Sequence, residues 1–223
     1  MFKRFFQKLK FKAMARQLRK PGGAMGNKVG LMMNKANESL YDFTLDTMQL
    51  APGERVLEIG FGNGKFFTKI FSKAADLHIS GLDFSATMVQ AARLENEQHI
   101  KENKLALVQG SSSEMPFADN SFDKIYCINV VYFWDEPQHH LQEIKRVLKP
   151  GGLFFATIRT KESMDQMPFT QYGFTKYTEQ SWKEVIEKNH LHFEKAVTLN
   201  EPELEFDGKP FRVQSLCLVA KKI

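Results

Sequence analysis

The sequence predicts an α/β protein: a three-layer, Rossmann-like sandwich of about seven mostly parallel strands, with an antiparallel last strand and an N-terminal helical lid. Three observations predict this class. Short, almost continuously apolar segments such as residues 56–59 alternate with helical patterns, which is typical of a parallel sheet covered on both faces. Glycines at every second position follow the first of these segments. The last two apolar segments are joined by a short polar stretch, residues 200–210, without room for a crossover helix, so they should pair antiparallel.

The composition fits a folded domain with an appendage. The chain has 223 residues, 43% of them hydrophobic, which is enough for a core. We divide it into an N-terminal extension, residues 1–49, and a domain over residues 50–223. No apolar run reaches the roughly 18 residues that cross a bilayer. Cys127 and Cys217 lie in apolar segments and should be buried thiols of a reducing, cytoplasmic compartment, with a disulfide as the open alternative.

Positive charge is concentrated in residues 1–20. This segment holds eight Lys or Arg and no acidic residue, whereas the rest of the chain has 23 basic and 26 acidic residues. A nucleic-acid-binding face is therefore not expected on the folded body. Apolar side chains recur at helical spacing at Phe2, Phe5, Phe6, Leu9 and Ala13. We interpret the segment either as an amphipathic helix that contacts an anionic membrane or closes over a substrate, or as a solvated terminus.

The remaining elements follow in order. Gly-rich residues 19–30 should form a hinge for the lid. Periodicity then predicts helices over 34–50, 65–73, 86–98 and 137–149, and strands over 56–59, 77–83, 105–110, 122–131 and 153–158. A helix that begins after the capping residue Thr178 and two strands, 192–199 and 211–222, complete the chain.

The glycine-rich turn after the first strand is the first candidate binding site. Its spacing is E-x-G-x-G-x-G, from Glu58 through Gly60 and Gly62 to Gly64. Ligands of such sheets bind at the carboxyl ends of the strands, so a ligand should lie against this backbone. The dinucleotide fingerprint G-x-G-x-x-G fails, because its third glycine falls on Lys65. An NAD-linked oxidoreductase is therefore a distant alternative.

Four blocks in order resemble the class I S-adenosylmethionine-dependent methyltransferases, most closely the small-molecule, quinone-biosynthesis type (methyltransferase type 11). They are "VLEIGFGNG", "GLDFSATMVQAAR", "LVQGSSSEMPFADNSFDKIYCINVVYFW" and "EIKRVLKPGGLFF", and the resemblance covers about residues 50–160. It implies S-adenosylmethionine as the cofactor and S-adenosylhomocysteine as the product. It also implies methyl transfer by in-line displacement to a small, hydrophobic or aromatic acceptor.

The resemblance implies a cofactor site as well. Its residues in this chain are Glu58, Gly60, Phe61, Gly62, Gly64, Asp83, Phe84, Met88, Ser111, Ser112, Asn129 and Val130. Glu58 should help hold the cofactor ammonium, and Asp83 should accept hydrogen bonds from the ribose hydroxyls. Phe84 and Met88 should sandwich the adenine. Ser111 departs from the family, which typically has an acidic residue there, so the adenine edge should be held more weakly.

The aromatic segment after the fourth strand should border the acceptor. The expected substrate-binding residues are Tyr132, Phe133, Trp134, Met167 and Phe169, with plain packing as the open alternative. Tyr132 is the catalytic candidate, because its hydroxyl is able to orient or deprotonate an acceptor hydroxyl. A general base is required only if the acceptor arrives protonated at neutral pH, because methyl transfer from a sulfonium depends mainly on alignment. The N-terminal segment, with Asn34 and Asn37, should select the acceptor.

The histidines are not expected to take part. His139 and His140 point about 100° apart on a helix whose inward face is apolar, so both should be surface or boundary residues. His190 and His192 have no third ligand nearby, so no metal is expected. Two functional alternatives stay open: a membrane lipid or quinone as acceptor, recruited through residues 1–20, and a protein that binds S-adenosylmethionine without turnover. The acceptor atom is left open between oxygen, nitrogen, carbon and sulfur.

Overall fold

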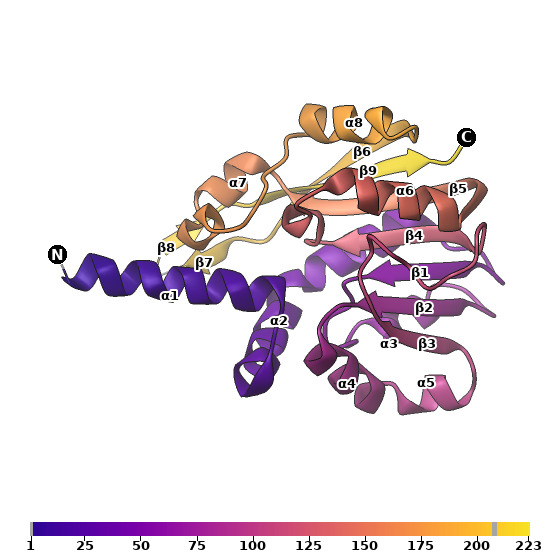
Figure 1. Cartoon of the computed structure of the whole chain (residues 1–223), viewed down its shortest axis with the longest axis horizontal. Coiled ribbons are helices and arrows are strands. Elements are labelled where there is room, and N and C mark those ends of the chain that lie inside the picture. The colour runs from indigo at the N-terminus through magenta and orange to yellow at the C-terminus, as the bar shows by residue number, and fades with distance from the viewer. Residues whose placement is uncertain (1, 207–208) are drawn as a thin grey trace.

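The structure is a computed structural model that describes residues 2–206 and 209–223. A seven-stranded sheet forms its middle layer (Figure 1). The strands are β1 (Arg55–Ile59), β2 (His78–Asp83), β3 (Leu105–Gln109), β4 (Phe122–Ile128), β5 (Leu148–Arg159), β6 (His192–Asn200) and β9 (Gln214–Lys221). Their order is β3-β2-β1-β4-β5-β9-β6, and β9 alone runs in the direction opposite to the other strands of this sheet. The predicted fold class, with its antiparallel last strand, is confirmed.

Helices cover both faces of the sheet. They are α1 (Phe2–Arg19), α2 (Gly23–Met48), α3 (Phe67–Phe71), α4 (Ala86–Glu95), α5 (Glu97–Lys101), α6 (Pro137–Val147), α7 (Lys161–Asp165) and α8 (Glu179–Lys188), with 3-10 turns η1 (Val131–Phe133) and η2 (Pro168–Gln171). Alternate strand positions face opposite layers. Leu57 and Ile59 of β1 pack with α6 and α8, whereas Val56 packs with α2, α3 and α4. Two apolar cores therefore enclose the sheet.

The N-terminal helices differ from the predicted hinge. α2 begins at Gly23, so Gly26 and Gly30 lie inside a helix, and only residues 20–22 join it to α1. A Cβ on Gly26 would lie 2.8 Å from the backbone carbon of Pro21, and one on Gly30 would lie 3.4 Å from the sulfur of Met88. Gly26 therefore permits close packing against Pro21, whereas a Cβ on Gly30 would make an ordinary van der Waals contact. α1 lies beyond the carboxyl ends of the central strands (Figure 1).

The stretch over 200–210 also differs from expectation. It was predicted as a plain polar connection, yet it contributes to a separate two-stranded sheet of β7 (Leu204–Phe206) and β8 (Lys209–Phe211). The two strands pair antiparallel, as in a hairpin.

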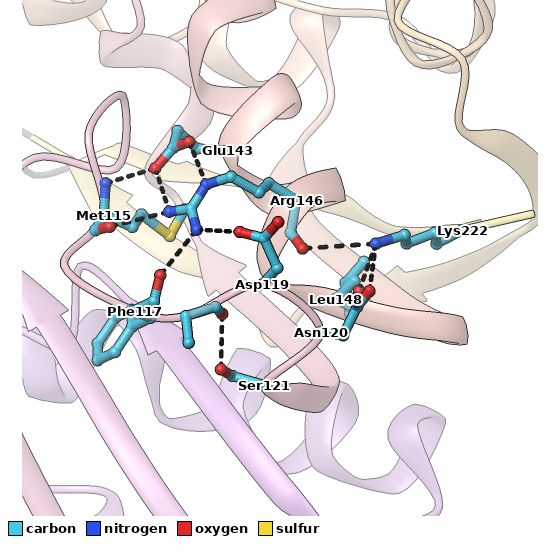
Figure 2. A network of polar contacts seen from close by, with 10 residues as sticks. Met115, Phe117, Asp119, Asn120, Ser121, Glu143, Arg146, Leu148 and Lys222 are labelled. Atoms are coloured by element: carbon cyan, nitrogen blue, oxygen red, sulfur yellow. Dashed lines mark hydrogen bonds and ion pairs between the residues drawn. The ribbon is translucent and has the colours of Figure 1, made fainter.

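Arg146 of α6 holds the loop between β3 and β4 in place. Its guanidinium donates to the carbonyls of Met115 (2.9 Å) and Phe117 (2.8 Å) and pairs with Asp119 and Glu143, both at 2.7 Å (Figure 2). Glu143 in turn accepts a bond from the Met115 N–H at 2.6 Å. Backbone and side-chain partners together fix a long irregular loop, and this loop begins with the serines of the candidate site.

Two expectations from composition meet the structure here. Cys127 and Cys217 are buried free thiols, which confirms the burial that their apolar segments predicted. Over the described residues, no helix combines the length and the apolar character needed to cross a bilayer.

Candidate functional site

A cavity of about 500 Å³ opens at the carboxyl ends of β1, β2 and β4. Nine of the twelve predicted cofactor residues border it: Gly60, Gly62, Asp83, Phe84, Met88, Ser111, Ser112, Asn129 and Val130. Glu58, Phe61 and Gly64 do not. The structure thus gathers residues from four separate loops into one cavity, where parallel strands of an open sheet end.

The three glycines of the turn have different roles. All have positive φ, 75° at Gly60, 59° at Gly62 and 72° at Gly64, which only glycine adopts without strain. A Cβ on Gly60 would lie 2.4 Å from the Val130 side chain, and one on Gly64 would lie 2.7 Å from Ala92 of α4. A Cβ on Gly62 would meet no described atom within 4 Å. Gly62 therefore exposes its backbone to the cavity on the side where a Cβ would lie, its bare face, whereas the absence of a side chain at Gly64 allows α4 to pack against the turn.

Asp83 joins the tips of β1 and β2. Its two carboxylate oxygens accept hydrogen bonds from the backbone N–H groups of Gly62 (3.0 Å) and Ser85 (2.8 Å). Burial raises its pKa to about 6, although both bonds and the Lys20 charge oppose this shift. The carboxylate is therefore largely ionised at neutral pH. Each oxygen keeps a further lone pair, so this side chain fits the hydroxyls of a ribose.

Glu58 lies off the cavity, contrary to the expected contact with a cofactor ammonium. It is 2% exposed, and its two oxygens accept from the hydroxyls of Tyr41 (2.5 Å) and Tyr126 (2.6 Å). Its position in β1 points it toward α2, on the same face as Val56. Burial raises its pKa to about 7, against the lowering effect of the two tyrosine bonds. Glu58 therefore ties α2 to β1 and β4.

Replacing Glu58 by glutamine should change how stability depends on pH. Since the folded-state pKa lies above the ordinary value of 4.5, the folded protein keeps this proton between about pH 4.5 and 7 while the unfolded chain releases it. The carboxyl's contribution is complete below pH 4.5 and is lost as pH rises through about 7. We expect the unfolding free energy of wild type, relative to Glu58→Gln, to fall from pH 4.5 to 8. Urea unfolding across this range measures it, and parallel curves would contradict the assignment.

Phe61, Phe84 and Met88 divide between core and cavity. Phe61 is buried in the core, where a Cβ on Gly81 would come within 2.6 Å of its ring. Phe84 is partly exposed, with the Lys20 ammonium 5.1 Å from its ring centroid, and Met88 is fully buried. Both Phe84 and Met88 border the cavity beside Asp83, where an adenosyl group would extend.

His139 and His140 both border the first cavity, and His140 is half-buried, as expected of a boundary residue. The His140 ring stacks on Trp134 with centroids 4.6 Å apart, and its Nδ1 lies 2.7 Å from the Ser112 hydroxyl. Burial lowers its pKa to about 4, so the imidazole is neutral near pH 7. Trp134 was expected beside the acceptor, but it borders only this first cavity and is buried against the core. No periodicity signal marks His140, because the turn at Trp134 brings the two rings together.

A second cavity of about 250 Å³ adjoins the first. Leu18, Met33, Asn129 and Phe133 border both. Of the expected substrate residues, Tyr132, Phe133, Met167 and Phe169 border it. Met14 of α1 and Asn37 of α2 also contribute, whereas Asn34 borders neither cavity. The wall is mostly Met and Phe, which fits an apolar ligand.

Tyr132 is not placed to act as a base. Its hydroxyl accepts from the Arg159 N–H and lies 3.1 Å from Asn129 Oδ1 and 3.2 Å from the Arg159 carbonyl. Burial raises its pKa far above the ordinary value. Its ring borders the second cavity, but its hydroxyl is engaged within the fold.

In the described segments, no group of three His, Cys, Asp or Glu side chains has a metal-binding arrangement.

Comparisons with known proteins agree with this geometry. A family model described as a methyltransferase domain matches residues 57–156. The uncharacterized methyltransferase YdaC of Bacillus subtilis is 28% identical over 134 residues, which are 60% of this chain and 72% of that protein. The sterol 24-C-methyltransferase ERG6B of Gibberella zeae is 38% identical over 105 residues, 47% of this chain, and the chain spans 27% of that enzyme's length.

Solved structures show the same fold. A chain described as a methyltransferase, from a complex with the Trm112 methyltransferase activator of Haloferax volcanii, superimposes with a TM-score of 0.77. The match covers 95% of this chain and 97% of the other at 20% identity. The likeness therefore extends beyond the 57–156 segment to the N-terminal helices and the last strands.

Proposed function

We propose that this chain, which belongs to the class I S-adenosylmethionine-dependent methyltransferases, transfers a methyl group from a cofactor in the first cavity to a small, largely apolar acceptor in the second. The observation that carries the proposal is the shared border of the two cavities. Asn129 and Phe133 face both, so ligands in the two cavities would meet there. Such an arrangement supplies the alignment that methyl transfer requires.

The residues of the first cavity fit the cofactor. The bare face of Gly62 leaves room for a ligand against the backbone, and Asp83 would accept from the ribose hydroxyls. Ser111 and Ser112 lie where the adenine edge would be read. When bound, S-adenosylmethionine supplies a methyl group that its sulfonium already activates. The Met and Phe wall of the second cavity would exclude water from the transfer.

Label transfer tests this proposal. Incubating the protein with S-adenosylmethionine carrying a radioactive methyl group and fractionated extract of its own organism should label one low-molecular-weight, apolar product. An Asp83→Ala variant in parallel should give no product. Binding of S-adenosylhomocysteine without any labelled small molecule in any fraction would contradict transfer to such an acceptor.

A membrane-held acceptor is the second candidate, and α1 favours it. Phe6 and Leu9 are 65% and 47% exposed, and the exposed lysines Lys8 and Lys12 lie on the same helix. Met14 of this helix borders the second cavity. A basic helix with exposed apolar side chains binds anionic bilayers at the headgroup level. We propose that α1 brings the second cavity to such a surface.

Removing two α1 charges should weaken vesicle binding. Each lysine near an anionic surface contributes about 1 kcal/mol, so Lys8→Gln with Lys12→Gln should lower the vesicle partition coefficient roughly thirtyfold. Sedimentation with phosphatidylserine-containing vesicles at low salt measures this. The matched control replaces Lys101 and Lys183, whose side chains are 67% and 41% exposed on other helices, by glutamine. Equal losses in both pairs, or no wild-type sedimentation, would exclude α1 as a membrane contact.

A further inference from the structure

Arg159, the last residue of β5, holds a guanidinium at the wall of the second cavity. Its Nε and Nη2 donate to the two carboxylate oxygens of Glu201 at 3.0 and 2.9 Å, and Nη2 also donates to the Ala36 carbonyl at 2.8 Å. Glu201 is buried and accepts a further bond from Ser215 at 2.5 Å. These contacts fix the plane of the guanidinium. Among the described residues no group accepts from Nη1, and Arg159 borders the cavity.

Asn37 presents a second donor beside it. The Tyr132 hydroxyl reaches Asn129 Oδ1 at 3.1 Å, which orients that amide, and Asn129 Nδ2 then donates to Asn37 Oδ1 at 3.1 Å. The orientation of Asn37 follows, because its oxygen is taken by Asn129. Its Nδ2 has no protein acceptor within 2–206 and 209–223, and the residue borders the cavity. The hydrogen bonds from Tyr132 through Asn129 to Asn37 therefore leave the Asn37 Nδ2 group available to donate to a ligand.

Among the described residues that border this cavity, Arg159 Nη1 and Asn37 Nδ2 are side-chain N–H donors for which no protein acceptor is found. Thr170, another polar residue of the wall, donates its hydroxyl to the Met164 carbonyl at 2.7 Å. Asn37 contacts Asn129, which borders both cavities, so the Asn37 donor lies near the point where the methyl group would arrive. A protonated amine there would lose its water and face a guanidinium without an acceptor. An oxygen with lone pairs would satisfy both donors.

We infer that the acceptor presents an acidic oxygen, a phenol or an enol, to Arg159 Nη1 and Asn37 Nδ2, with its apolar body against the Met and Phe wall. This inference rests on the proposed function. The two donors stabilise the oxyanion, so the hydroxyl loses its proton to solvent before transfer. The oxygen then forms a bond to the methyl carbon while the carbon–sulfur bond breaks, and that electron pair stays on sulfur. The products are a neutral methyl ether and S-adenosylhomocysteine, and no protein base is needed.

Three naphthalene probes test this assignment. The full chain, saturated with S-adenosylhomocysteine, is titrated with 2-naphthol, 2-naphthylmethylamine and naphthalene. Wild type should bind the naphthol at least tenfold more tightly than the amine. Absorbance should show the pKa of the bound naphthol lowered. Asn37→Asp keeps the Asn129 contact and replaces the donor by an acceptor. This variant should bind naphthol roughly tenfold more weakly, with a higher pKa of the bound naphthol, and should bind the amine more tightly. Its affinity for naphthalene should be unchanged.

Arg159→Lys provides the second variant, because it keeps the charge opposite Glu201 and removes the Nη1 donor. It should lower naphthol affinity several-fold and leave naphthalene binding unchanged. If either variant lowers the affinity for naphthol and for naphthalene equally, the residue serves only packing, and the inference is wrong. Equal wild-type affinity for naphthol and amine overturns it too. Failure of S-adenosylhomocysteine to bind at all would instead overturn the proposed function.

Discussion

Asp83→Ala should raise the dissociation constant for S-adenosylhomocysteine by about two orders of magnitude. The carboxylate is buried at the tip of β2 and ionised near neutral pH, and it would accept from two ribose hydroxyls. Hydrogen bonds to a charged group contribute about 1.5 kcal/mol each at the lower end, so losing two costs about 3 kcal/mol. That corresponds to roughly a hundredfold change in affinity. Titration calorimetry measures it directly.

The variants around Asp83 separate charge from shape. Asp83→Asn keeps one carbonyl oxygen able to accept from Gly62 or Ser85, so its loss should be intermediate. Asp46→Ala, at an exposed carboxylate of α2 that pairs with Lys73, should leave the dissociation constant unchanged. If Asp83→Ala binds like Asp46→Ala, the ribose contact assigned to Asp83 is wrong.

Gly64→Val should destabilise the fold by about 3 kcal/mol. The substitution forces a β-branched residue to a φ of 72°, which costs roughly 1–2 kcal/mol, and it drives Cβ to 2.7 Å from Ala92. Overpacking of this kind costs a further 1–3 kcal/mol. For a chain of this size the melting temperature should fall by roughly 6–12 °C. Thermal unfolding without ligand provides the measurement.

Gly62 is the matched control for Gly64. Gly62→Ala incurs the cost of positive φ, but its Cβ enters open space, so the melting temperature should fall by only a few degrees. Its Cβ would occupy the side of the cavity that a ligand uses, so affinity for S-adenosylhomocysteine should fall clearly. Thermal unfolding and calorimetry should therefore rank the two variants in opposite orders. The same ranking in both assays would contradict the division of roles within the turn.

The fold followed from sequence where one strand or helix carries its own signal. The central parallel strands are nearly continuous apolar runs because helices bury both faces, and the short link after residue 199 required an antiparallel partner. The glycine roles did not follow. Gly64 packs against Ala92 and Gly26 against Pro21, and neither neighbour is adjacent in sequence. The glycine spacing identified the turn, but it did not show which glycine has open space where a Cβ would lie.

The residues of the candidate site could likewise be predicted only where a local sequence feature marks them. Asp83 ends a strand beside the glycine turn, so topology alone places it in the cavity. Glu58 faces α2 because side chains alternate along β1, and its tyrosine partners lie 17 and 68 residues away. Arg159 carries no motif, since its partner Glu201 is 42 residues away and the hydrogen bonds that reach Asn37 run through a tertiary contact. Polar contacts between residues so far apart in the chain produce no periodic sequence pattern from which they could be predicted.

Calorimetry of the wild-type chain with S-adenosylhomocysteine, alongside NAD, tests the central claim most directly. The bare face of Gly62 and the carboxylate of Asp83 predict one-to-one binding of S-adenosylhomocysteine and no heat with NAD. Absence of S-adenosylhomocysteine binding, or tighter binding of NAD, would contradict the assignment of the first cavity.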